Sequence, residues 1–413
     1  MAPRITSYLQ HVWKKYAPAK RYYCDYAAAT PISPAVAWRM LRVARQHYAN
    51  PSAVHQPGVA AAAVVHESRR ELARALGVRP DEITFTASGS EANNLALQGV
   101  VEARVAAGAR YDELSIVTTK TEHPSILEVV RALAARGVRI DYVPVDGEGR
   151  IDGGALKARL AEPAKIVSFA YANSEVGVVQ PVRRFVRSIK QLHPQTLVHL
   201  DAAQAPLWLS CNRHQLGVDL MSLDAGKCNG PKGVGVLVAA EDIPLAPVVR
   251  GGGQERGYRA GTENTAGIAG ACLAIVTAQQ SYAARRARVY PKACALKAAL
   301  MARVPEAVCN GPAFTDTVDE LERLPNNVHI SLPGLDTEYA VVYLDTHGVS
   351  ASTKSACSGA GGGRSDVVYE MTGDTARASS TIRFSLDPSV RGSFATHIAE
   401  TLATFRSLQQ GVD

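Results

Sequence analysis

Apolar strand-like segments alternate with amphipathic helix-like segments along most of this chain. Residues 82–103, 114–137 and 165–192 each show the pattern of a strand, a short turn and a helix, and a further strand begins the segment 196–207. Strands that alternate with helices over such a length indicate an α/β unit with a mostly parallel sheet. In sheets of this kind, the groups that bind ligands gather in the loops after the carboxyl ends of the strands.

The segment from Val218 to Gly235 combines a short buried strand with two glycine-containing turns. The first turn carries Lys227, and the second contains Lys232. A lysine on a turn directly after an apolar strand is placed to form a Schiff base, because a partly desolvated ammonium loses its proton readily. The alternative is that both are solvated loop lysines, since most lysines are exposed.

The pattern changes after about residue 275. A long Ala- and Arg-rich helix is predicted over residues 274–304, and shorter strands follow at 326–334 and 380–387. Between these strands the Gly-rich tract 355–366 predicts a mobile loop. We therefore expect a smaller α+β domain after the large one. The expected organisation is an N-terminal basic amphipathic segment (1–21), a large domain (22–275) and a small C-terminal domain (276–413).

The composition is that of a soluble globular protein. Hydrophobic residues make up 46% and charged residues 20% of the chain, and no apolar run reaches the length of about 18 residues that a membrane helix needs. The formal charge is +7, but the Lys and Arg residues are scattered, with few aromatic residues between them. This spread favours a generally basic surface over a nucleic-acid site. We expect neither a membrane nor a nucleic acid as a partner.

The cysteines are odd in number and widely spaced, and no CxxC pair occurs. The seven are Cys24, Cys211, Cys228, Cys272, Cys294, Cys309 and Cys357. Such spacing argues against a disulfide framework and against a cysteine-ligated metal site, and it favours a reducing compartment. We expect a cytoplasmic location. The basic N-terminal segment lacks the apolar core of a secretory signal. An organelle stays open as the alternative location.

A small-residue turn between a strand and a helix, SGSEANN at residues 88–94, is a candidate phosphate site. Gly89 and Ser90 are the expected donors. Small residues let the backbone approach a phosphate, and the N-terminus of a helix stabilises negative charge. The alternative is an ordinary serine cap of the helix with a glutamate in its first turn.

Polar residues also follow other predicted strands. His123 suits stacking on a flat cofactor ring or acid–base chemistry, although many loop histidines do neither. Asp201 ends an apolar strand, where a carboxylate is placed to pair with the protonated nitrogen of a pyridoxal phosphate ring, and Gln204 is placed to bond the ring oxygen. The alternative for Asp201 is a helix cap.

Two residues of the C-terminal part are candidates for contact with a substrate. Cys357 is flanked by Ser, Ala and Gly, and a thiol in an exposed flexible loop can reach a substrate. Arg383 interrupts an apolar strand, and its guanidinium suits an α-carboxylate. The polar Gly-rich loop 250–264 is too polar for a core and too patterned for a linker.

Taken together, these segments resemble the cysteine desulfurases, the NifS/IscS-like branch of the class V aminotransferase family of fold-type I pyridoxal phosphate (PLP) enzymes. The resemblance runs from about Tyr22 to Leu386, and its ordered set of motifs is highly specific. It is carried by DYAAATP, NPSAVHQPG, TASGSEANN, TEHPSI, SEVGVVQP, HLDAAQ, GKCNGPKGVG, GGGQERGYRAGTEN, SACSG and TIRFSL. The resemblance implies a large domain with a mostly parallel, seven-stranded sheet flanked by helices, plus a smaller α+β domain.

The resemblance also implies pyridoxal 5'-phosphate as the cofactor and a role for each candidate residue. Lys227 would form the Schiff base and move the substrate Cα proton. The other implied contacts are His123 stacked on the ring, Asp201 at the ring nitrogen, Gln204 at the ring oxygen, Gly89 and Ser90 at the phosphate, and Arg383 with Asn173 at the substrate.

Two further implied roles concern reach between parts of the protein. Thr262 would contact the phosphate in the neighbouring subunit, which requires a homodimer. Cys357 would be the nucleophile that forms a persulfide, and the form SACSG resembles the branch with a long mobile cysteine loop.

The chain departs from the family pattern at three positions that contact the cofactor. Gly226 stands where the family has His, Asp224 where it has Ser, and Ser174 where it has Asn. Loss of two phosphate donors predicts PLP binding weaker by a factor of about ten to several thousand, and an ionised Asp near the phosphate would weaken it further.

The resulting hypothesis is a cysteine desulfurase that converts L-cysteine to L-alanine and passes the sulfur from Cys357 to an acceptor protein, for iron–sulfur clusters or for thiolation. Two alternatives stay open from the sequence. One is a related PLP lyase that acts on selenocysteine or cysteine sulfinate. The other is a cofactor-poor scaffold or partner-binding homologue, which the three departures suggest.

Overall fold

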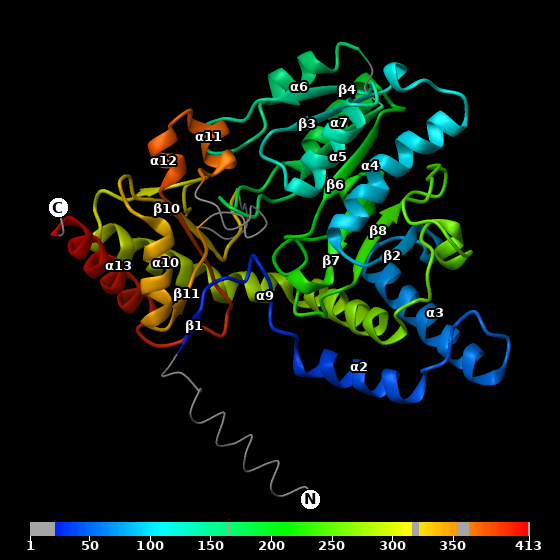
Figure 1. The fold of residues 1–413 in the computed structure, drawn as a ribbon, viewed down its shortest axis with the longest axis horizontal. Coiled ribbons are helices and arrows are strands. Elements are labelled where there is room, and N and C mark those ends of the chain that lie inside the picture. The colour runs from blue at the N-terminus through cyan, green and yellow to red at the C-terminus, as the bar shows by residue number, and fades with distance from the viewer. Residues whose placement is uncertain (1–20, 163–164, 316–321, 354–362, 412–413) are drawn as a thin grey trace, which may run out of the picture.

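A seven-stranded sheet forms the centre of the large part of the molecule (Figure 1). The computed structural model describes residues 21–162, 165–315, 322–353 and 363–411. In spatial order the strands are β2 (Ile83–Thr86), β8 (Gly235–Ala239), β7 (Leu220–Asp224), β6 (Leu197–Asp201), β5 (Ile166–Ala170), β3 (Ser115–Thr119) and β4 (Arg139–Val143). Only β8 runs antiparallel to its neighbours, so the mostly parallel sheet is confirmed.

Both faces of this sheet are buried. Successive side chains of a strand point to opposite faces, so adjacent residues pack into different cores. Ile116 and Ile166 pack with the helices α4 (Gly89–Ala106) and α5 (Pro124–Ala134), whereas the adjacent Val117 and Val167 belong to the larger core on the other face. The helices of this part are α2 (Pro34–Gln46), α3 (Gln56–Leu76), α4 (Gly89–Ala106), α5 (Pro124–Ala134), α6 (Gly153–Arg159), α7 (Val182–Leu192) and α8 (Arg213–Leu216).

A smaller α+β part is built on a three-stranded antiparallel sheet. Its order is β12 (Thr381–Ser385), β10 (Asn327–Ser331) and β9 (Val308–Cys309). Beside it, β1 (Tyr22–Tyr23) pairs in parallel with β11 (Val349–Ser350). The helices of this part are α10 (Thr337–Thr346), α11 (Asp366–Thr372), α12 (Thr375–Ser379) and α13 (Phe394–Gln410).

The helix α9 (Thr265–Arg303) runs between the two parts and packs against α2 and α3 at one end and α13 at the other (Figure 1). The domain limits at residues 275 and 276 stay a prediction. The predicted N-terminal segment, except for Arg21, and the cysteine of the Gly-rich tract lie outside the described residues. Within the described parts of the chain, no helix has the length and apolar character needed to cross a bilayer.

The topology brings several chain segments to one edge of the large sheet. Strands β3, β5, β6 and β7 are mutually parallel, so their carboxyl ends lie at the same edge. His123, Asn173, Asp201 and Lys227 lie at or just after these ends, which places them around one space.

Candidate functional site

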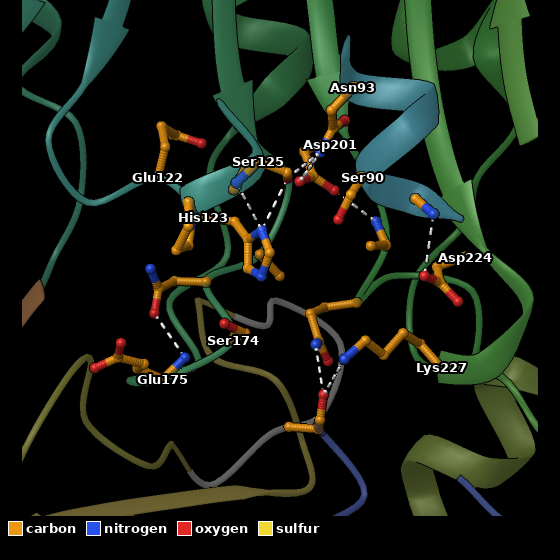
Figure 2. A pocket seen from close by; sticks show the side chains of 18 of the residues that line it. Ser90, Asn93, Glu122, His123, Ser125, Ser174, Glu175, Asp201, Asp224 and Lys227 are labelled. Carbon is orange, nitrogen blue, oxygen red and sulfur yellow. Dashed lines mark hydrogen bonds between the residues drawn. The ribbon is translucent and has the colours of Figure 1, made fainter. Parts of the chain in front are cut away.

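A cavity of about 190 Å³ lies at this edge. Ten of the predicted site residues line it, and Figure 2 shows this region from close by. They are Gly89, Ser90, His123, Asn173, Ser174, Asp201, Gln204, Asp224, Lys227 and Arg383. Thr262 is exposed and is not among the lining residues, and Cys357 lies outside the described residues.

Lys227 ends a short 3-10 turn (Ala225–Lys227) that directly follows β7. Its half-buried side chain crosses the cavity, and Nζ donates to the carbonyl oxygens of Ala27 at 3.0 Å and Ala28 at 2.6 Å (Figure 2). Backbone carbonyls accept both of these bonds. The amine is therefore positioned inside the cavity, unlike Lys232, which is exposed.

Asp201 ends β6 and is 8% exposed. Its Oδ2 accepts from the side-chain amide of Asn93 at 2.8 Å, and its Oδ1 accepts from the N–H of Ala203 at 3.0 Å. These bonds fix the orientation of the carboxylate. A negative charge held at low exposure attracts a protonated ring nitrogen more strongly than the same charge in water. Gln204, from the same loop, donates to the carbonyl of Ala27 at 2.9 Å.

His123 caps the N-terminus of α5 and also faces the cavity. Its Nδ1 accepts from the N–H of Ser125 at 3.1 Å, and the hydroxyl of Ser125 lies 2.8 Å from the same nitrogen. Burial lowers the pKa of His123, which favours the neutral ring. Because Nδ1 is an acceptor, the ring proton resides on Nε2, which is directed toward the cavity (Figure 2). Asn93 donates to Ser125 as well, at 2.9 Å, so one amide links His123 with Asp201.

Glu122 is a buried carboxyl in the cavity wall that the sequence reasoning did not identify. It is 6% exposed, and the hydroxyl of Thr119 donates to its Oε1 at 2.7 Å. Burial raises the pKa of Glu122 to about 8, and the neighbouring Asp201 adds to this effect. At neutral pH the group is therefore mostly protonated and uncharged.

The Glu122→Gln variant is expected to gain stability relative to the wild type as pH rises. The folded state keeps the Glu122 proton up to a pKa of about 8, while the unfolded chain loses it above 4.5. The wild-type free energy of unfolding therefore falls through this window, by about 1 kcal/mol per pH unit, and Gln removes this loss. Urea denaturation across the window measures it, with the exposed Glu128→Gln as the matched control. If the difference in the free energy of unfolding between wild type and variant did not change with pH, the raised pKa of Glu122 would be contradicted.

Arg383, on β12, is 2% exposed and reaches the cavity from the smaller part of the molecule. Its guanidinium donates to the carbonyl of Ser174 at 2.9 Å and to Oδ1 of Asp25 at 2.8 Å. Two of its five N–H groups make these bonds, so the fork retains donors for a substrate carboxylate. Asn173 instead shapes the wall: its amide nitrogen donates to the carbonyl of Thr121 at 3.0 Å.

The N-terminus of α4 forms the end of the cavity expected to hold a phosphate. Ser88 caps this helix and accepts from the N–H of Glu91 at 3.1 Å, so the helix-cap interpretation also holds. The N–H of Gly89 donates to Oδ2 of Asp224 at 3.1 Å. The N–H of Gly226 donates to Oδ1 of the same carboxylate at 2.8 Å.

The ring-binding half of the site fits pyridoxal phosphate. The cavity brings a lysine amine, a fixed carboxylate and an imidazole together on separate loops, as a Schiff-base aldehyde with a basic ring nitrogen requires. Backbone donors for its phosphate are also present, but the carboxylate of Asp224 already accepts from two of them, the N–H groups of Gly89 and Gly226.

Sequence reasoning missed contacts made by distant segments. Asp25 and the carbonyls of Ala27 and Ala28 lie in DYAAATP, and Asn93 lies in TASGSEANN. Both segments stood out as motifs, so the location was signalled. Which side chain contacts which partner depends on the fold.

Comparisons with known proteins agree on one group over most of the chain. Residues 22–391 match the family described as Aminotransferase class-V. A protein named cysteine desulfurase IscS from Dictyoglomus turgidum is 35% identical over 367 residues, which cover 89% of this chain and 90% of that protein. A solved structure named NifS-like protein superposes with a TM-score of 0.85 at 30% identity, covering 94% of this chain and all of the other. A structure titled SspA in complex with cysteine gives a TM-score of 0.73 at 26% identity, over 89% of this chain and 99% of the other.

Proposed function

We propose that this chain, which belongs to the Aminotransferase class-V family and is a cysteine desulfurase, takes sulfur from L-cysteine through Lys227 and Cys357. In this reaction the sulfur of L-cysteine moves to a protein thiol, so L-cysteine and the thiol give L-alanine and a protein persulfide, with all atoms accounted for. The observation that carries the assignment of residues is the convergence of the Lys227 amine, the Asp201 carboxylate and the His123 imidazole on one cavity.

Each residue contributes a separate physical task. When bound, pyridoxal phosphate supplies an electron sink for the substrate Cα. Asp201 would hold the ring nitrogen in its protonated form, and Arg383 would orient the substrate carboxylate. Lys227 removes and returns the Cα proton, while the Nε2–H of His123 is the proton donor directed to the cavity. Since Glu122 is mostly neutral at pH 7, it adds little charge to compete with Asp201.

The state of the other cysteines supports the proposed role of Cys357 as the thiol. None of the six cysteines in the described residues lines the cavity. Four of the six are buried, and burial raises the pKa of each thiol, which disfavours the reactive thiolate. They are Cys24, Cys211, Cys228 and Cys272.

The chain on either side of Cys357 is attached to the cavity wall. The N–H of Arg383 donates to the carbonyl of Ser352 at 2.7 Å, and the hydroxyl of Ser365 donates to Oε2 of the cavity residue Glu175 at 2.6 Å. In the sequence, Cys357 follows Ser352 by five residues. This short tether supports its assignment as the nucleophile.

We also propose a homodimer in which Thr262 contacts the phosphate of the neighbouring subunit. Several large apolar or aromatic side chains between residues 38 and 59 are exposed, with Trp38 71% exposed and Val54 96% exposed. The others are Leu41, Tyr48 and Val59. A run of exposed apolar residues favours burial against a partner, and we assign that partner as a second copy of this chain. A monomer in sedimentation equilibrium at micromolar concentration would contradict this.

The persulfide sulfur is proposed to pass to an acceptor protein, for iron–sulfur clusters or for thiolation, in the cytoplasm. L-cysteine is the proposed substrate, which is supported by the relative SspA, whose structure holds cysteine. Selenocysteine and cysteine sulfinate are the competing substrates for the same cavity.

A direct assay tests this function. With PLP, L-cysteine and a thiol reductant, the protein is expected to release alanine and sulfide in equal amounts, because the reductant regenerates the Cys357 thiol after each turnover. Alanine release from the three substrates, compared by kcat/KM, separates the readings. If cysteine sulfinate or selenocysteine gave a higher kcat/KM, that compound would replace L-cysteine as the proposed substrate. If none of the three released alanine, the proposed enzymatic activity would be contradicted.

A further inference from the structure

The carboxylate of Asp224 occupies an anion-binding position inside the cavity. Its two carboxylate oxygens accept from two backbone N–H groups on separate segments: Gly89 at the start of α4 and Gly226 in the turn before Lys227. We call the N–H groups of Gly89 and Gly226 the two-amide site. Figure 2 shows Asp224 directly below the first turn of the helix, with the bond from the backbone nitrogen drawn.

The two-amide site is suited to an anion for reasons of charge as well as geometry. The 18-residue helix α4 presents the positive end of its dipole at Gly89. The free N–H groups of a helix N-terminus can bind either a phosphate or a carboxylate. Here the anion is part of the chain, so it is present at a high effective concentration whatever the solution contains.

The carboxylate fits closely because both donors are glycines. A Cβ added at Gly89 would lie 3.2 Å from Oδ2 of Asp224, and a Cβ added at Gly226 would lie 3.2 Å from Oδ1. Both contacts are tighter than ordinary packing. The Asp at position 224 and the missing side chain at position 226 therefore form one arrangement: the glycine leaves the room that the carboxylate uses.

We propose that Asp224 is an internal anion that takes the place of the cofactor phosphate at the two-amide site. The proposal rests on the proposed function, since it concerns the same cofactor. A phosphate that enters must displace the carboxylate or lie beside a like charge. The chain therefore gains little binding energy from the phosphate at the two-amide site and holds the cofactor mainly through its ring and Lys227. As a result it accepts unphosphorylated pyridoxal nearly as well as pyridoxal phosphate.

The first test uses inorganic phosphate on the cofactor-free full-length protein, with the thermal midpoint as the readout. Asp224→Ser empties the two-amide site, so millimolar phosphate is expected to raise the midpoint of this variant and not that of the wild type. Asp242→Ser, which removes an exposed carboxylate, is the matched control for the change in net charge. Equal stabilisation of wild type and Asp224→Ser by phosphate would overturn the proposal.

The second test compares the dissociation constants of pyridoxal and pyridoxal phosphate, followed by absorption. The ratio used is the dissociation constant of pyridoxal divided by that of pyridoxal phosphate. For the wild type this ratio is expected to stay within about tenfold of one. Asp224→Ser is expected to raise the ratio by about a hundredfold, since each of two bonds to a charged phosphate contributes about tenfold or more. Asp224→Asn keeps the side-chain shape and is expected to move the ratio in the same direction, which guards against a folding defect in the Ser variant. A wild type that already prefers pyridoxal phosphate a hundredfold overturns the proposal.

The two failures are distinguishable. If neither aldehyde modifies Lys227 after borohydride reduction, the proposed function fails, while phosphate stabilisation confined to Asp224→Ser still supports the internal anion. If Lys227 is modified but Asp224→Ser binds pyridoxal phosphate more weakly than the wild type, the internal anion fails and the proposed function stands.

Discussion

Replacing Lys227 by alanine is expected to lower kcat by at least about a thousandfold, because this one amine both anchors the aldehyde and carries the Cα proton. The side chain is half-buried and its ammonium donates to the carbonyls of Ala27 and Ala28. Lys227→Arg keeps a cation at those carbonyls but remains protonated, so it is expected to be equally inactive. Alanine release from L-cysteine is the measurement.

Borohydride reduction separates this role from a structural one. The wild-type protein is expected to carry a pyridoxyl adduct on Lys227 in peptide mapping, and both variants are expected to lack it. Exposed Lys157 on α6 provides the control, since Lys157→Ala removes a lysine without entering the cavity. A small primary amine added to Lys227→Ala is expected to restore part of the activity, because it replaces the missing base. Full activity without any added amine would remove Lys227 from the mechanism.

Cys357→Ala is expected to reduce sulfide release by at least about a hundredfold, since the variant has no thiol to attack the substrate sulfur. The yellow absorption of the bound cofactor and the Lys227 adduct are expected to persist, because neither depends on the thiol. Sulfide is measured with L-cysteine and a reductant.

The other accessible cysteines give the matched controls. Cys294 and Cys309 are half-buried and neither lines the cavity. Their replacement by alanine is expected to leave sulfide release within about threefold of wild type, the range expected for substitutions remote from a site. Undiminished sulfide release by Cys357→Ala, or its loss in Cys309→Ala, would move the nucleophile to another thiol.

Much of the fold followed from local patterns. Alternating strands and helices predicted the parallel sheet, and the helix predicted at residues 274–304 is found as α9 (Thr265–Arg303). The strand and turn that carry Lys227 also appear as predicted. These features depend on neighbours in the sequence, through hydrophobic periodicity and turn residues, which is why they can be predicted without the fold.

The residues around the cavity were also predicted, but their interactions were not. Asp224 was expected to weaken phosphate binding, yet its bond to Gly89 joins residues 135 positions apart. The pKa of Glu122, raised to about 8, arises from burial that no sequence pattern revealed. His123 was interpreted as either a loop residue or a cofactor contact, whereas the structure has it cap α5 through Nδ1 and face the cavity with the rest of its ring.

The sequence by itself determined the order of strands and helices, the family to which the chain belongs and which residue types can carry its chemistry. Only the tertiary structure decided that Arg383 pairs with Asp25 and that a carboxylate occupies the two-amide site. The physical reason is the separation in the sequence over which each interaction acts. Periodicity and turn preferences act between near neighbours, whereas these contacts form only when packing of the sheet and helices brings distant segments within hydrogen-bond distance.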